Sequence, residues 1–137
     1  MAFFATDAAA IFIVTEPWVR LAPNGRSAEA YMELRSTEGA RLVAVRAADA
    51  TGVVLLAPGS KRAAVAEIPL AADATVKLAP GAFRIALAHL DRPLKLGDRV
   101  ALVLTIESSD GGRQEIPANA EVRRRSPTDD HLRAHKH

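Results

Sequence analysis

Apolar residues alternate with other residues along several short runs, and this period of two limits the fold more than any other feature of the sequence. In the run 100–106, for example, Val100, Leu102 and Leu104 would share one face of a strand. Similar runs occur at 11–15, 30–35, 41–46, 75–78, 83–88 and 115–122. The continuous apolar run 53–56 indicates a strand that is buried on both faces or packed beneath a loop. No segment carries a helical period over three turns, although one short helix is possible in the alanine-rich stretch 61–72.

Turn-forming residues separate these runs. At Pro58-Gly59 and Pro80-Gly81, proline fixes its own φ and glycine permits a positive one. The strongest hairpin signal is Asp110-Gly111-Gly112, which lies between two alternating runs. About eight short strands at this spacing predict an all-β fold, an antiparallel sandwich or barrel of Greek-key type. The chain of 137 residues suffices for one such domain with one sizeable core.

The composition predicts where the domain begins and ends. We expect a flexible N-terminal segment over residues 1–9, the β-sandwich domain over 10–122 and a flexible, basic, histidine-containing tail over 123–137. The tail has Leu132 as its only large apolar residue. The first residues are apolar but lack a basic region, so a complete signal peptide is not visible. No apolar run reaches the roughly 20 residues that a membrane-spanning helix needs.

The chain lacks the residues that several classes of function require. The chain has no cysteine, which excludes disulfides, thiolate metal sites and a cysteine nucleophile. Its formal net charge of +2 is too small to indicate nucleic-acid binding. His89 is the only histidine within 10–122, so no serine there has a spaced histidine partner for catalysis. We therefore expect a protein that is not an enzyme and that binds no nucleic acid.

The other three histidines, His131, His135 and His137, lie in the tail. On a helix His131 and His135 would share a face, whereas on a strand His135 and His137 would do so. Imidazole is a ligand for Cu(II), Ni(II) and Zn(II), so the three residues are a candidate weak metal site. The alternative interpretation is a solvated tail with incidental histidines, and the sequence leaves both open.

A family resemblance adds to this pattern. The order of several short motifs resembles that of the periplasmic copper chaperones called PCu(A)C. The matching pieces are Val14-Thr15-Glu16-Pro17-Trp18-Val19-Arg20, Ala28-Glu29-Ala30-Tyr31-Met32, Arg41-Leu42-Val43-Ala44-Val45, Val76-Lys77-Leu78-Ala79-Pro80-Gly81 and Leu94-Lys95-Leu96-Gly97-Asp98. The resemblance covers most of 10–122. It implies a cupredoxin-like Greek-key antiparallel β-sandwich, a periplasmic or exported location and a role in copper trafficking or copper-enzyme assembly.

The same resemblance implies a Cu(I) site built from a His, a later Met and a His-x-Met pair after the Pro-Gly loop. Imidazole and thioether groups are soft enough for Cu(I). In this sequence the first His position falls at or beside Leu56, the pair falls on Arg84 and Ala86, and residues 61–67 contain no Met. We expect the only internal methionine, Met32, to fill the core. The prediction is therefore a degenerate site with no tightly bound cofactor, and copper held weakly, if at all, by the tail.

Two functional hypotheses follow from the sequence. The first is a copper-chaperone-family domain that acts through its tail histidines or as the partner of a copper-enzyme assembly protein. The second is a metal-free interaction module that uses the Arg84 end of the sandwich as its contact surface. The sequence predicts no membrane span and does not determine the oligomeric state.

Overall fold

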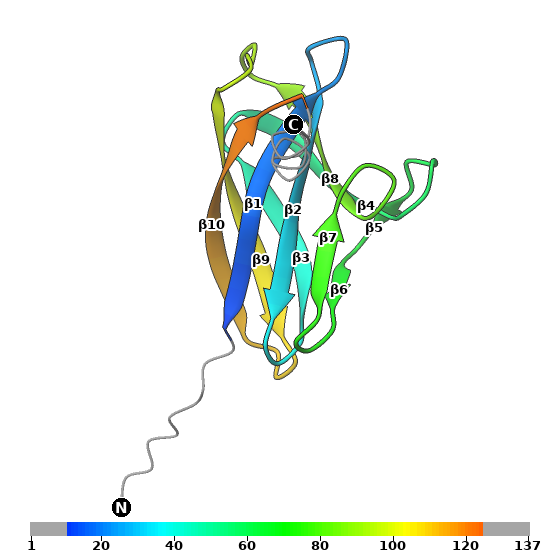
Figure 1. Cartoon of the computed structure of the whole chain (residues 1–137), viewed down its shortest axis with the longest axis vertical. Helices are drawn as coiled ribbons and strands as arrows, with labels where there is room; N and C mark the ends of the chain where they lie inside the picture. The colour runs from blue at the N-terminus through cyan, green and yellow to red at the C-terminus, as the bar shows by residue number, and fades with distance from the viewer. Residues whose placement is uncertain (1–10, 125–137) are drawn as a thin grey trace, which may run out of the picture.

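A computed structural model describes residues 11–124, and in this part of the chain all regular structure is β-strand. Ten strands form one sheet that curls round on itself, so that β9 and β3 pass behind β1 and β2 (Figure 1). The strands are β1 (Phe12–Leu21), β2 (Ala28–Ser36), β3 (Ala40–Ala47), β4 (Ala50–Leu56), β5 (Ala64–Val65), β6 (Ile68–Leu70), β7 (Thr75–Leu78), β8 (Arg84–Leu90), β9 (Arg99–Ser108) and β10 (Arg113–Val122). The all-β prediction is confirmed.

The order of the strands in the sheet is β5-β4-β8-β2-β1-β10-β9-β3-β6, with β7 also paired to β2. Every named pair is antiparallel except β1 with β10, which is parallel. The antiparallel sandwich expected from the sequence thus contains one parallel pair. Since β1 and β10 come from opposite ends of the domain, no hairpin turn fixes their relative direction. The last strands of the sheet, β5 and β6, have only two and three residues, which limits edge-to-edge pairing with other chains.

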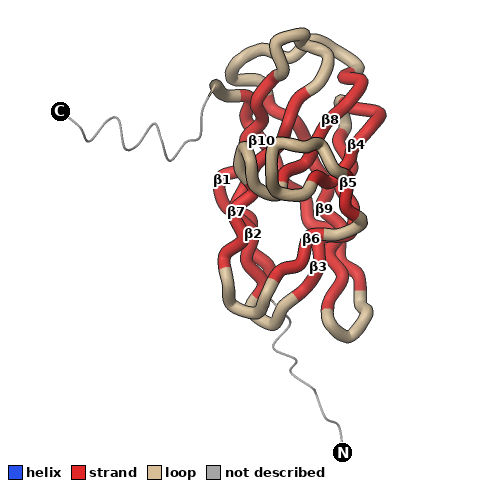
Figure 2. The backbone as a smooth tube through the Cα atoms, turned by 90° about the vertical axis from the view of Figure 1, so that its right-hand side faces the viewer, coloured by secondary structure: helices blue, strands red, loops and turns tan. Residues whose placement is uncertain are grey.

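The strands of the curled sheet stand around a common interior (Figure 2). The buried residues that form the core there are almost entirely aliphatic. In β9 the alternating Val100, Leu102 and Leu104 are at most 1% exposed, as the period of two predicts. Met32 belongs to the same cluster and is 2% exposed, so its predicted place in the core is confirmed. The core buries the apolar faces of strands that lie far apart in the sequence, and this burial is the main force that closes the sheet.

The stretch 61–72 forms no helix, so that expectation is wrong. It contains β5 and β6 instead, and β6 pairs with β3. Ile68 and Leu70 are 0% and 2% exposed, while Pro69 between them points to solvent. Burial of these alternating side chains outweighs the helix propensity of the alanines around them.

The continuous apolar run in β4 is buried on both faces at its end. Leu55 belongs to the main core and Leu56 is buried on the opposite face, with exposures of 6% and 3%. Val54, one residue earlier, is 41% exposed. Adjacent aliphatic residues in one strand therefore have very different environments.

This contrast gives a test of the strand register. Replacement of the core residue, Leu55→Ala, should lower the free energy of unfolding by about 2–5 kcal/mol, because it removes buried methyl groups and leaves a cavity. Val54→Ala on the same strand is the matched control and should cost less than about 1 kcal/mol. Urea denaturation followed by circular dichroism measures both. Equal costs would show that the register of β4 is wrong.

Candidate functional site

The three positions at which the resemblance places copper ligands lie together on one face of the sheet. Leu56 on β4 is directly opposite Arg84 on β8, and Ala86 is paired with Glu29 on β2. Since side chains alternate along a strand, these residues face away from Ile85 and its neighbours in the main core. We call this side of β1, β2, β8 and β4 the outer face. It carries Trp18, Arg20, Glu29, Tyr31, Leu56, Arg84 and Ala86.

Arg84 is buried at the centre of this face. Its side chain is only 5% exposed. Nε donates to Glu29 Oε2 at 3.4 Å. The other guanidinium nitrogens donate to four backbone carbonyls, those of Ala57 (3.0 Å), Ala82 (3.1 Å), Gly59 (3.4 Å) and Lys61 (3.5 Å). Arg84 itself is therefore not exposed at a contact surface, because the segment after β4 wraps its guanidinium group. A contact surface at this end of the sandwich stays a prediction.

Glu29 is the acidic partner of this cation. Its Oε2 also accepts a hydrogen bond from Arg62 Nη1 at 2.8 Å, and its Oε1 accepts one from the hydroxyl of Tyr31. Burial by itself would raise the pKa of Glu29. The hydrogen bonds from Tyr31 and Arg62 and the charges of Arg84 and Arg62 outweigh this effect, so the pKa lies below its ordinary value of 4.5. Glu29 is therefore a carboxylate at neutral pH, and it compensates the charge of Arg84.

Two aromatic rings complete the outer face. Trp18 and Tyr31 are opposite each other on β1 and β2, and their ring centroids are 4.7 Å apart. Burial, together with the hydrogen bond and the charge of Glu29, raises the pKa of Tyr31, so its hydroxyl stays protonated and donates. The guanidinium carbon of Arg20 lies 5.5 Å from the centre of the Tyr31 ring, within the range of a cation–π interaction.

The Pro80-Gly81 turn is held beside the segment that wraps Arg84. The amide of Gly59 donates to the carbonyl of Gly81 at 2.9 Å. Both glycines have a positive φ, 115° at Gly59 and 82° at Gly81, which other residues adopt only with strain. The turn therefore has a structural role here, since it positions carbonyls around the guanidinium group.

These residues do not fit a Cu(I) ion. Leu56 and Ala86 have no metal-ligating atom, and the guanidinium group of Arg84 carries only N–H donors and has no lone pair for a metal. Met32 lies in the main core. His89 is exposed and five residues from Arg84 along β8, or about 16 Å in an extended strand. Residues 11–124 contain no group of three or more His, Cys, Asp or Glu side chains that could hold a metal.

The tail histidines His131, His135 and His137 lie outside the described residues, so the candidate tail site stays a prediction. Glu29 and Arg62 are the charged residues that the sequence analysis missed. Glu29 occupies the polar position of an alternating strand, where a carboxylate is usually exposed. Arg62 lies in a stretch with no periodicity. No signal in the sequence pairs either residue with Arg84, which is 55 and 22 positions away respectively.

The fold is similar to those of several solved structures. The apo PCuAC domain from PmoF1 has a TM-score of 0.70 at 23% identity, covering 82% of this chain and 92% of that domain. The copper-bound PCuAC domain from PmoF2 has a TM-score of 0.63 at 23% identity, covering 82% and 93%. Cu(I)-bound DR1885 from Deinococcus radiodurans has a TM-score of 0.66 at 26% identity, covering 87% and 83%. No curated protein matches the chain.

The fold is thus that of a PCuAC domain, a copper-chaperone-like class with a cupredoxin-like β-sandwich. Residues 13–122 match the family described as "Putative lipoprotein LpqE-like". The chain belongs to this LpqE-like family, and the resemblance to PCu(A)C proteins seen in the sequence is confirmed. Residues 11–124 include no helix that could cross a membrane.

Glu29 pairs with two arginines at the centre of the outer face, and we expect their replacement to lower stability by unequal amounts. Arg84→Met should cost about 3–5 kcal/mol of stability, because it leaves Glu29 and several carbonyls without their buried partner. Arg62→Met is the matched control: Arg62 contacts the same carboxylate oxygen but is 61% exposed, and it should cost no more than about 1 kcal/mol. Urea denaturation at pH 7 measures both, and equal losses would contradict the central role of Arg84.

The lowered pKa of Glu29 predicts a pH dependence. A carboxyl group with a depressed pKa in the folded state adds stability above its unfolded pKa, and this contribution is lost as the pH falls through the folded value. Glu29→Gln should therefore reduce stability most at neutral pH, and the difference from wild type should shrink below about pH 4.5, the ordinary value. Unfolding curves from pH 7 to pH 3 measure this difference. Glu33→Gln, on the same strand outside the ion-pair network, is the control, and a constant difference for Glu29→Gln would contradict the assignment.

Proposed function

We propose that this protein works in copper trafficking or copper-enzyme assembly outside the cytoplasm, as a PCuAC-type module whose sandwich does not itself ligate Cu(I). The observation that carries the proposal is the guanidinium group of Arg84, which lies where the family resemblance places a histidine ligand. It is held there by Glu29 and by backbone carbonyls. The family description as a lipoprotein supports an exported location.

The charge of Arg84 works against a metal cation at this point. Two unit positive charges 4 Å apart repel by roughly 4 kcal/mol at an effective dielectric constant of about 20. That energy corresponds to a loss of at most about a thousandfold in affinity, and the compensating charge of Glu29 makes the loss smaller. Since arginine keeps its proton at any physiological pH, this repulsion is permanent. The missing imidazole and thioether donors and the fixed cation therefore act in the same direction.

Two roles within copper trafficking are compatible with such a sandwich. The protein could contact a copper-enzyme assembly protein as a metal-free interaction module with no catalytic step. Alternatively, it could carry a copper ion on His131, His135 and His137 while the sandwich serves as the scaffold. A site made of imidazoles alone suits Cu(II) better than Cu(I), which prefers softer donors. Preferential binding of Cu(II) would therefore indicate a site on the tail histidines, whereas tight binding of Cu(I) would indicate a site in the sandwich like that of the PCu(A)C family.

A metal titration tests the proposal. Full-length protein and a variant with His131→Ala, His135→Ala and His137→Ala are titrated with Cu(I) against a chromophoric chelator, and with Cu(II) by calorimetry. We expect no Cu(I) binding tighter than the micromolar range for either protein, and weak Cu(II) binding only when the tail histidines are present. A variant carrying Leu56→His, Arg84→His and Ala86→Met restores soft donors and is the positive control. Tight Cu(I) binding by the variant without tail histidines would overturn the proposal.

A further inference from the structure

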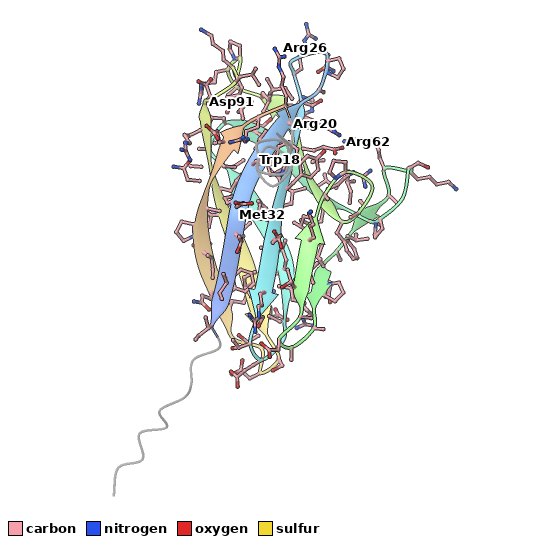
Figure 3. All side chains as sticks on the ribbon, in the orientation of Figure 1. Trp18, Arg20, Arg26, Met32, Arg62 and Asp91 are labelled. Atoms are coloured by element: carbon pink, nitrogen blue, oxygen red, sulfur yellow. The ribbon has the colours of Figure 1, made fainter. Side chains whose placement is uncertain are left out.

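A pocket of about 570 Å³ opens at one end of the outer face, beside the turn between β1 and β2. Its charged lining residues are Arg20, Glu29 and Arg62. Figure 3 shows Arg20 on β1 and Arg62 on the segment after β4 at the same end of the molecule. None of the three positions at which the resemblance places copper ligands lines this pocket. Ligand binding in the pocket therefore does not depend on whether the sandwich binds copper. Its volume lies in the range of small-molecule sites.

The charges around the pocket favour an anion. The only carboxylate in its lining, Glu29, is already bonded to Tyr31, Arg62 and Arg84. Within residues 11–124 Arg20 makes no ion pair, and its guanidinium group instead lies over the ring of Tyr31. The pocket lining thus has two guanidinium groups and one carboxylate, an excess of one positive charge, and the carboxylate is paired already. An incoming anion would find donors that the protein itself does not use.

The remaining walls indicate what kind of anion fits. Leu21, Ala22 and Pro23 supply apolar surface, and Ser27 supplies a hydroxyl group at the mouth of the turn. Apolar walls suit a ligand with a hydrocarbon body better than a strongly hydrated inorganic ion. The nearby carboxylate of Glu29 repels a doubly charged phosphate more than a singly charged carboxylate. The planar fork of arginine matches a carboxylate group in bidentate geometry.

We propose that this pocket binds a monocarboxylate with a small apolar body, with Arg20 and Arg62 as the residues that hold the carboxylate group. The ligand could be a free organic acid or the C-terminal carboxylate of a peptide, since both present the same group. Arg20 is exposed and contacts only a ring face, so the pocket can lose this residue without loss of the fold. This separates ligand binding from stability in a test.

The test follows backbone amide resonances of the isotope-labelled full chain during titration with benzoylglycine. Its uncharged amide, benzoylglycinamide, is the matched ligand control. We expect saturable shifts at Leu21, Ser27 and Ala28 with the acid and none with the amide. Arg20→Gln and Arg62→Gln should each weaken binding about tenfold, as for the loss of a charged hydrogen bond. Arg46→Gln, an exposed arginine on β3 that pairs with Glu115, should leave binding unchanged.

Further arms of the same titration distinguish the source of the carboxylate. One arm uses a hexapeptide that ends in a glycine with a free carboxylate. If it binds more tightly than benzoylglycine, the ligand is a peptide C-terminus. If it binds equally or more weakly, the ligand is a free organic acid. The amidated hexapeptide should not bind. The proposal is overturned by absence of binding, by binding that Arg20→Gln leaves unchanged, or by inorganic phosphate binding as tightly as the acid.

Discussion

The set of hydrogen bonds made by Arg84 is the interaction on which the outer face depends. One guanidinium group bonds to the carboxylate of Glu29 on β2, to the segment that follows β4 and to the turn before β8. A buried charge is tolerated only when it is paired and its donors are satisfied. Arginine meets this condition with a rigid fork of five donors, which a lysine at the same position could not reproduce. The cation and its oxygen acceptors therefore add a buried link between elements that also pair within the sheet.

The Arg84 network lies in a sandwich with the fold of a PCuAC domain. Under the function proposed above, the cation at the positions where the family resemblance places copper ligands is part of the chain, the guanidinium group of Arg84. Carbonyls of the segment after β4 and of the turn before β8 accept hydrogen bonds from Arg84. Burial of the aliphatic core, and not a metal site, closes the sheet.

The outer face has a closed part and an open part. Around Arg84 the segment after β4 excludes solvent, and the buried cation is paired with Glu29. Toward the β1–β2 turn the face opens into the pocket, where Arg20 presents a charge with no acidic partner among residues 11–124. Glu29 and Tyr31 lie at the boundary and contribute to both parts. The closed part stabilises the fold, and the open part is the place at which a ligand can add interactions that the protein lacks.

The sequence by itself determined the all-β class, most strands, the place of Met32 in the core and the absence of soft donors at Leu56, Arg84 and Ala86. These follow from local alternation, turn residues and residue chemistry, which act over a few positions of the chain. Tertiary structure alone decided the parallel pairing of β1 with β10, the strands in 61–72 and the burial of Arg84 with Glu29. These depend on contacts between residues far apart in the chain. No local pattern records which distant carboxylate or carbonyl a side chain will meet.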